Sequence, residues 1–226
     1  MMRRTLSVCR VKTPSSTIGR LAIKRSYTHW PFLSEEHIMI SSMCKSFAQT
    51  ELQPVAAQND RDHCFPTKQI EKLGELGMLG VCISTDYGGS GMDALSYAIA
   101  IEEISRGCAG TGCIMAVHNS MFCAPLSKYG THEQKEQYLR PTASGQKIGC
   151  FMLSEPGNGS DAGAASTTAR DDGNHWILNG SKAWITNSKE AAYGLVLATT
   201  DKSLKHKGIS CFIVDMDTPG ITIGKI

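Results

Sequence analysis

The spacing of the apolar residues changes near Lys147, and this change constrains the fold more than any other feature of the 226-residue sequence. Before it, as in the stretch from Ser34 to Gln58, apolar residues recur at helical intervals, which predicts buried helical stripes. After it, short apolar runs bounded by Gly, Ser and Pro indicate strands. The sequence therefore predicts an α+β fold: an all-α helical domain over residues 31–146, followed by a β-sheet or barrel domain over residues 147–226.

Helix boundary signals divide the first part. Pro66 and Thr67 are typical of a helix start, and Asp93 is a predicted N-cap for another helix. Thr131 and Gln134 have the spacing of a capping box, which predicts a short helix that ends before Pro141.

Strand signals divide the second part. The predicted strands are Ile148–Leu153, Ala192–Thr199, Ile209–Val214 and Ile221–Ile223. Asn179-Gly180 is a preferred pair for a type I′ turn, so a hairpin is predicted to join His175–Leu178 to Ser181–Thr186.

Charge and composition exclude some classes of protein. The sequence is 41% hydrophobic and 19% charged, as in ordinary soluble domains, and no apolar run approaches the ~18 residues of a membrane span. Residues 1–34 contain seven Lys or Arg and no acid, which leaves 16 basic and 21 acidic residues in the remainder. A mildly acidic body argues against nucleic-acid binding.

The basic stretch at residues 1–30 is rich in Arg, Ser and Thr and lacks a long apolar core. This composition predicts a mitochondrial transit peptide, cleaved between Arg20 and Trp30. The alternative is a disordered basic tail that touches nucleic acid or lipid.

Metal and nucleophile motifs are not evident in the sequence. The nine cysteines form no C-x-x-C pair and are interpreted as buried reduced thiols, which fits a reducing matrix. The seven histidines show no ligand spacing, and neither a Ser-His-Asp arrangement nor a P-loop is visible. The Lys202–Lys207 cluster is most simply a solvated loop.

Two segments could hold a flat aromatic cofactor with a charged tail. The bend Gly157–Gly163 lacks the G-x-G-x-x-G spacing of a dinucleotide fingerprint, but its small residues would let backbone amides approach a pyrophosphate; a plain surface loop is the alternative. Trp184 and Thr186 would share one face of a strand, so an indole and a hydroxyl could meet the same ring, although an ordinary core tryptophan fits as well. Ser154 could supply another hydroxyl.

These segments resemble the acyl-CoA dehydrogenases. The run Phe151-Met152-Leu153-Ser154-Glu155-Pro156-Gly157-Asn158-Gly159-Ser160-Asp161 is similar to a signature of that family, and Trp184-Ile185-Thr186 is similar to its flavin-contacting strand. Glu102–Gly107 and Ala164–Arg170 most resemble the mitochondrial short-chain (butyryl) branch, and the likeness covers Pro31 to Ile226.

The resemblance implies FAD-dependent α,β-dehydrogenation of short-chain acyl-CoA in fatty-acid β-oxidation, with electrons passed to electron-transfer flavoprotein. It implies that Ser154 bonds the pyrimidine edge of the flavin, Trp184 packs on the ring and Thr186 bonds near N5. Gly159 and Ser160 would approach the pyrophosphate, and Ser160 also the acyl-CoA substrate. The full set of implied FAD-binding residues is Phe151, Met152, Leu153, Ser154, Glu155, Pro156, Gly157, Asn158, Gly159, Ser160, Trp184, Ile185 and Thr186.

The resemblance further implies a homotetramer in the mitochondrial matrix and a third, helical domain that carries the catalytic glutamate. No residue of this sequence matches that base, so poor flavin retention and no turnover are expected of the 226 residues alone. The alternatives are a catalytically silent flavin- or partner-binding fragment, and an acyl-CoA oxidase-like flavoenzyme. Acyl chain length and branching are left open.

Overall fold

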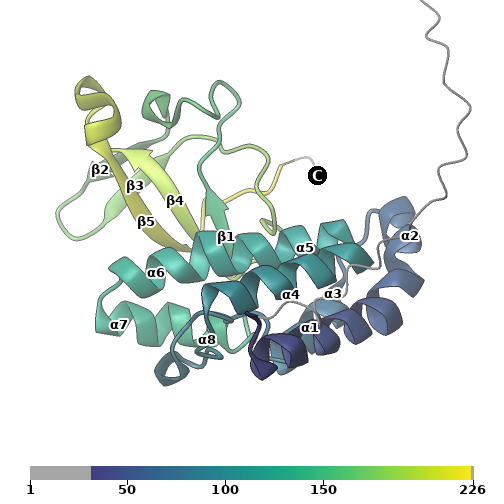
Figure 1. The fold of residues 1–226 in the computed structure, drawn as a ribbon. Coiled ribbons are helices and arrows are strands. Elements are labelled where there is room, and N and C mark those ends of the chain that lie inside the picture. The colour runs from purple at the N-terminus through teal and green to yellow at the C-terminus, as the bar shows by residue number, and fades with distance from the viewer. Residues whose placement is uncertain (1–31, 225–226) are drawn as a thin grey trace, which may run out of the picture.

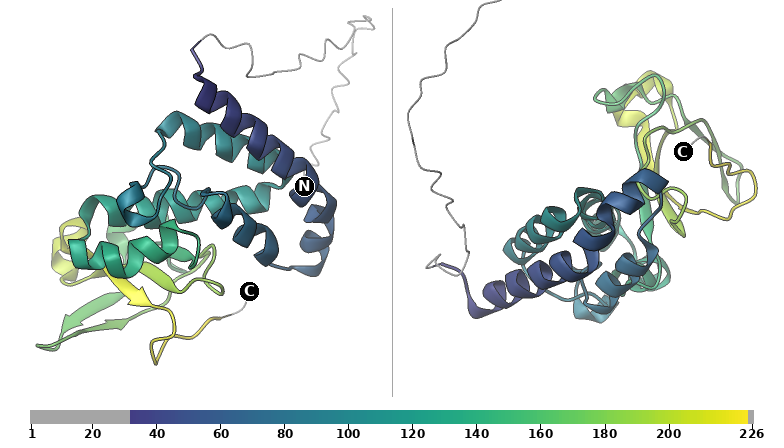
Figure 2. Two further views of the ribbon diagram at one scale, coloured as in Figure 1. Left: turned by 90° about the horizontal axis from the view of Figure 1, so that it is seen from below. Right: turned by 90° about the vertical axis from the view of Figure 1, so that its right-hand side faces the viewer.

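A computed structural model describes residues 32–224 as a group of helices followed by a mixed sheet. Figure 1 shows the sheet on one side of the helices, and in Figure 2 it projects from that side of the helical part. The predicted order of a helical part and then a sheet is therefore confirmed. The transit peptide predicted at residues 1–30 lies outside the described residues.

The helical part runs from α1 to α8. Its α-helices are α1 (Glu35–Phe47), α2 (Gln53–Asp62), α3 (Thr67–Glu75), α4 (Ala94–Gly107), α5 (Ala109–Ala116), α6 (Ala124–Tyr129), α7 (His132–Gln134) and α8 (Arg140–Ala143). Wide π-helical segments at Ala48–Leu52, Val117–Cys123 and Lys135–Leu139 connect several of them without a break. A core of buried residues that includes Cys44, Leu73 and Ile104 holds α1, α3 and α4 together.

The expected caps are present. The side chain of Asp93 accepts from the Ser96 N–H at the start of α4, and Thr131 forms a capping box with Gln134. The expectation that this last helix ends before Pro141 is wrong, because helical structure continues to Ala143. Pro141 stands in the first turn of α8, directly after a π-helical segment, where its missing N–H is tolerated.

The sheet has five strands within the described residues: β1 (Gly149–Met152), β2 (Thr168–Asp171), β3 (Trp176–Asn179), β4 (Tyr193–Thr199) and β5 (Ile209–Asp215). β4 is central: it pairs in parallel with β1, antiparallel with β5 along its whole length, and with β2 at Thr199. The strands predicted around β1, β4 and β5 are confirmed, whereas residues 221–223 form no strand.

The predicted Asn179-Gly180 hairpin is also wrong. β3 pairs antiparallel with β2, and the turn between them lies at Asp172–His175, where Gly173 has a left-handed φ of +87°. Gly180 is needed for a different reason, since a side chain at this position would overlap Thr167. The Asn-Gly pair therefore marks a close approach of two chain segments.

A second core joins the helices to the sheet. Phe122, Leu126 and Leu139 from the helical part are buried with Leu195 of β4, and Phe151 of β1 packs against them. This core fixes β1 against the helices, and the candidate site begins where β1 ends.

Candidate functional site

The bend that follows β1 contains most of the predicted site residues. After Met152 the chain leaves the sheet, and Glu155 and Asn158 close a tight turn through reciprocal backbone hydrogen bonds of 2.9 and 3.2 Å. Pro156 and Gly157 form the middle of this turn and are exposed. The turn directs the chain toward Gly159 and Ser160, which are also exposed.

Glu155 holds the bend from inside. Its carboxylate is buried, accepts from the N–H groups of Ser166 and Thr167 at 2.7 and 3.0 Å, and pairs with Lys182 at 2.9 Å. Burial alone raises the pKa of this carboxyl, but the hydrogen bonds from Ser166, Thr167 and Lys182 lower it well below its usual range. These contacts tie the bend to residues 166–167 and to Lys182, so the side chain of Glu155 organises the loop.

The two segments singled out in the sequence lie side by side. The Lys182 Nζ donates to the Leu153 carbonyl at 3.0 Å, and the Ala183 N–H donates to the Ser154 carbonyl at 2.9 Å. Four residues after Ala183, the Asn187 side chain donates to the Gly149 carbonyl at 3.3 Å. Residues 182–187 therefore run antiparallel to β1 and its extension, and they bring Trp184–Thr186 next to Leu153 and Ser154.

The expectation that Trp184 and Thr186 share one face of a strand is wrong. Residues 181–186 form no strand, and Trp184 has a left-handed φ of +60° in a bend. The bend turns the indole outward, so that it is 95% exposed, whereas Ile185 and Thr186 are half-buried. An indole exposed to this extent offers a bare aromatic face.

Three side-chain hydroxyls of these segments are unpaired in the described part of the chain. Within residues 32–224 the side-chain hydroxyls of Ser154, Ser160 and Thr186 make no hydrogen bond, and they are not among the buried unpaired groups. A side chain built at Gly157 or Gly159 would meet nothing within 4 Å, so the bend leaves room for a ligand to approach its backbone. These groups fit a flat ring with a phosphate-bearing tail.

An open cavity of about 630 Å³ extends from Ser160. Lys202, Lys205 and His206 line it together with Asp161 and Ser166. The basic residues belong to a 3-10 segment, Lys202–Gly208, just before β5. Interpretation of this cluster as a solvated loop missed the cavity, because only the fold places the cluster opposite Ser160. Three basic side chains beside one acid suit an anionic ligand.

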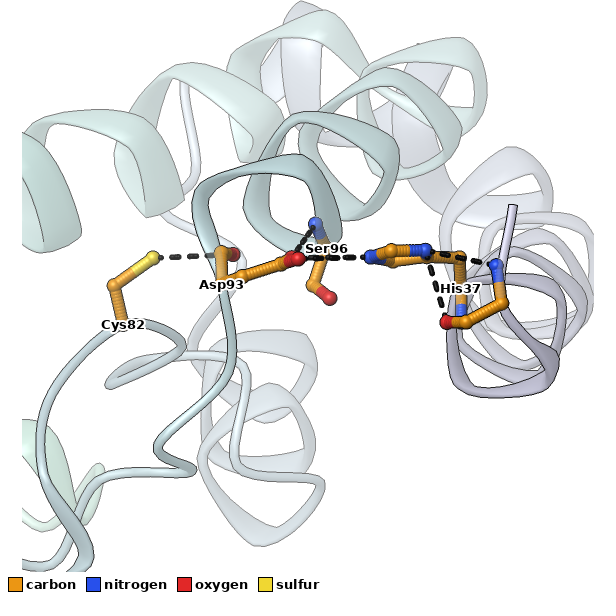
Figure 3. Close-up of polar contacts among 5 residues, drawn as sticks. His37, Cys82, Asp93 and Ser96 are labelled. Carbon is orange, nitrogen blue, oxygen red and sulfur yellow. Dashed lines mark hydrogen bonds and ion pairs between the residues drawn. The ribbon is translucent and has the colours of Figure 1, made fainter. Parts of the chain in front are cut away.

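A Ser-His-Asp arrangement, which the sequence pattern did not reveal, is present in the helical part. The Nδ1 of His37 lies 2.9 Å from the Ser34 hydroxyl, and its Nε2 lies 3.1 Å from the Asp93 carboxylate. Figure 3 shows that this carboxylate also binds Ser96, while the Cys82 thiol donates to the Asp93 carbonyl. The same Ser34 and Asp93 oxygens cap α1 and α4, so the arrangement joins two helix starts.

Other chemistry receives no support from the described residues. Between residues 32 and 224, no group of three or more His, Cys, Asp or Glu side chains could hold a metal ion. The same part of the chain contains no helix long and apolar enough to cross a membrane. Its eight cysteines are free, but only Cys44, Cys123 and Cys150 are buried, so the expectation of uniformly buried thiols is wrong.

Comparison with known proteins identifies the family of the chain. The family model for the acyl-CoA dehydrogenase N-terminal domain matches residues 34–146, and that for the middle domain matches residues 150–226. The mitochondrial short-chain specific acyl-CoA dehydrogenase of Rattus norvegicus is 57% identical over 193 residues, which are 85% of this chain and 47% of that protein. The chain thus spans about half the length of the curated relatives it matches.

Solved structures match over a similar extent. Butyryl-CoA dehydrogenase from Megasphaera elsdenii superposes with a TM-score of 0.82 at 36% identity, covering 85% of this chain and 51% of that one. A glutaryl-CoA dehydrogenase from Mycobacterium smegmatis in complex with FADH2 gives a TM-score of 0.80 at 36% identity, covering 86% and 49%. With both family models matched and the fold shared, the chain belongs to the acyl-CoA dehydrogenase family.

Proposed function

We propose that the protein catalyses FAD-dependent α,β-dehydrogenation of short-chain acyl-CoA thioesters and passes the electrons to electron-transfer flavoprotein. The observation that supports this most directly is the side-by-side placement of Leu153–Ser154 and Trp184–Thr186, two segments that carry an exposed indole and the hydroxyls of Ser154 and Thr186, which are unpaired within the described residues. An isoalloxazine ring has a flat face to stack and a polar edge to bond, and these residues offer both.

Each of the predicted residues has a role in this proposal. Trp184 packs against the ring, Ser154 bonds the pyrimidine edge, and Thr186 lies near N5, where its hydroxyl can donate or accept. When bound, FAD supplies a hydride acceptor for the β-carbon of the acyl chain. Phe151–Leu153 and Ile185 form the wall behind the ring, and the bend Glu155–Ser160 holds the pyrophosphate at its exposed end.

The cavity beside Ser160 suits the other end of the substrate. Coenzyme A carries phosphates, and Lys202, Lys205 and His206 line an open space that begins at Ser160. Charge-assisted hydrogen bonds to phosphate are among the stronger polar contacts in proteins. We therefore place acyl-CoA entry at Ser160. The proposed base that removes the α-proton is not assigned to any residue of this chain.

The assembly and compartment are part of the same proposal. We place the protein in the mitochondrial matrix, because the mammalian relatives are named as mitochondrial and the stretch at residues 1–30 has the composition of a transit peptide. The proposed homotetramer rests on the family resemblance alone. Import of a reporter that carries residues 1–34 into isolated mitochondria tests the compartment. Failure of import would reject the targeting role of this stretch.

The central test uses the full gene product, purified and supplied with FAD. We expect a stoichiometric flavin spectrum that bleaches anaerobically on addition of butyryl-CoA, and reoxidation by electron-transfer flavoprotein faster than by O2. Absence of bound flavin, or a flavin that butyryl-CoA leaves oxidised, would overturn the proposed activity. Faster reoxidation by O2 would replace it with the oxidase.

The stacking role of Trp184 has its own test. Replacement Trp184→Ala should raise the Kd for FAD at least about fivefold, because an aromatic contact is worth roughly 1 kcal/mol beyond its buried area. Trp176→Ala serves as the matched control, since Trp176 is also exposed but packs on Phe212 at the far end of the sheet. Equal FAD affinity in both variants would remove Trp184 from the flavin site.

A further inference from the structure

Asn187 occupies the junction between the helical part, β1 and the segment Trp184–Thr186. It is 6% exposed, and its side-chain Nδ2 donates to the carbonyl of Ile114 in α5 at 3.4 Å and to that of Gly149 in β1 at 3.3 Å. The backbone carbonyl of Asn187 accepts from the N–H groups of Glu190 and Ala191. Asn187, the residue directly after Thr186, thus connects its own segment to both α5 and β1.

Gly149, which accepts one of the two Asn187 bonds, is itself held tightly against the helical part. Its N–H donates to Nδ1 of the buried His118 at 3.1 Å, and the other ring nitrogen of His118 lies 3.1 Å from the Thr142 carbonyl. A side chain at Gly149 would overlap the buried Phe122 ring, so β1 lies directly on the helical part at this residue. A segment bonded to Gly149 therefore has a defined position relative to both parts of the molecule.

The orientation of the Asn187 amide follows from its neighbours. Both groups within reach of Nδ2 are carbonyl oxygens, which only accept, so a rotated amide would place Oδ1 against two other oxygens. A residue in a turn does not need its side chain to donate two hydrogen bonds, so these bonds call for another explanation. Asn187 does have a left-handed φ of +69°, which asparagine tolerates, but this backbone role accounts for neither bond.

We propose that Asn187 is a positioning residue, which holds Trp184–Thr186 against β1 so that the indole and the Thr186 hydroxyl meet the flavin in register. The inference rests on the proposed function, because it assigns the flavin as the ligand. Lys182 and Ala183 anchor the segment at its other end through the carbonyls of Leu153 and Ser154. Loss of the Asn187 side chain removes the two bonds that tie the other end of the segment to Ile114 and Gly149.

Two variants separate the side-chain role from the backbone role. Asn187→Gly keeps the left-handed conformation and removes both donated bonds. Asn187→Asp keeps the shape but sets a carboxylate against two carbonyl oxygens. The matched control is His63→Gly, since His63 also has a left-handed φ, of +52°, but is exposed at the end of α2.

Two readouts are measured on the full gene product. Without FAD, hydrogen exchange at the Ala183 amide should accelerate about tenfold in Asn187→Gly, because the segment opens from one end more easily. With FAD, the absorption maximum and the reduction potential of the bound flavin should shift in both variants, and its Kd should rise about tenfold, equivalent to about 1.4 kcal/mol. His63→Gly should leave all these values unchanged.

The outcomes distinguish this inference from the proposed function. If the unmodified protein binds no FAD, the proposed function fails, and exchange at Ala183 still decides whether Asn187 holds the segment. If the exchange, flavin spectrum and potential of Asn187→Gly match those of the unmodified protein, the positioning role is overturned, even if the melting temperature falls. Failure of both variants to fold would equally overturn it, because Asn187 would then support the whole fold.

Discussion

At the residue scale, a buried ion pair determines the shape of the candidate site. The side chains of Glu155 and Lys182 are only 2% and 9% exposed, and their contact joins the bend after β1 to the segment that carries Trp184. A carboxylate in such a place is stable only while its partners remain, since desolvating an unpaired charge costs several kcal/mol. The pair is therefore best tested by removing one charge at a time.

Replacement Lys182→Met should lower the free energy of unfolding by roughly 3–5 kcal/mol, because it leaves the Glu155 carboxylate buried without its cation. The double variant Glu155→Gln, Lys182→Met should recover part of this loss. Chemical denaturation of the full gene product measures both values. The control is Lys189→Met, an exposed lysine of the following turn, and an equal loss in that variant would contradict the role given to the pair.

At the element scale, prolines and caps control where the helices run. Pro54, Pro125 and Pro141 all stand in the first turn of an α-helix that directly follows a π-helical segment. A first-turn N–H has no obligatory partner within its helix, so proline does not end the helical course there. Elsewhere, Ser34, His37 and Asp93 join the starts of α1 and α4.

The cap on α4 predicts a pH effect. Hydrogen bonds from Ser96, and then from His37, lower the pKa of Asp93 from 3.8 to about 2. Because the folded pKa is depressed, this stabilisation is fully present above pH 3.8 and is lost as the pH falls through about 2. The Asp93→Asn variant should therefore lose less stability than the unmodified protein across this window.

Denaturation midpoints measured between pH 5 and pH 2 give the comparison. The control is Asp60→Asn, since Asp60 is an exposed residue of α2 whose carboxylate makes no hydrogen bond within the described residues. Parallel curves for Asp93→Asn and the unmodified protein would show that the cap does not contribute to stability.

At the scale of the whole molecule, the contact between helices and sheet is both apolar and polar. Phe122 and Leu195 pack in the core between the two parts, and His118 bridges them through Gly149 of β1 and Thr142 of α8. His118 has no exposed surface, and burial lowers its pKa to about 4. Since Nδ1 accepts the Gly149 N–H, the ring must be neutral for this bridge to form.

The bridge predicts acid sensitivity of the whole fold. Between pH 6.5 and about 4 the unfolded chain binds a proton at His118 that the folded chain does not, so the free energy of unfolding falls as the pH falls. The loss over this range amounts to roughly 3 kcal/mol. His118→Asn should be less stable at pH 7, but its free energy of unfolding should change less over this pH range. The free energy of unfolding of His63→Asn should follow that of the unmodified protein. A steep decline retained in His118→Asn would refute the assignment.

Part of this structure could be predicted from local patterns. Helical spacing and the cap residues Asp93 and Thr131 identified helices, and continuous apolar runs identified β1, β4 and β5, because these signals depend on residues a few positions apart. The composition of Phe151–Ser160 and Trp184–Thr186 likewise marked both segments of the candidate site. The predictions of a hairpin turn at Asn179-Gly180 and of a strand over residues 181–186 were wrong, because long-range contacts override the local turn preference there.

The sequence by itself determined the order of helices and strands, the family, and which two segments carry the candidate site. Only the tertiary structure decided how those segments meet: Glu155 turned inward to Lys182, Trp184 turned outward, and Asn187 bonded to Gly149. These contacts join residues 27 and 38 positions apart. Local periodicity carries no information over such separations, because it reports only on residues a few positions apart.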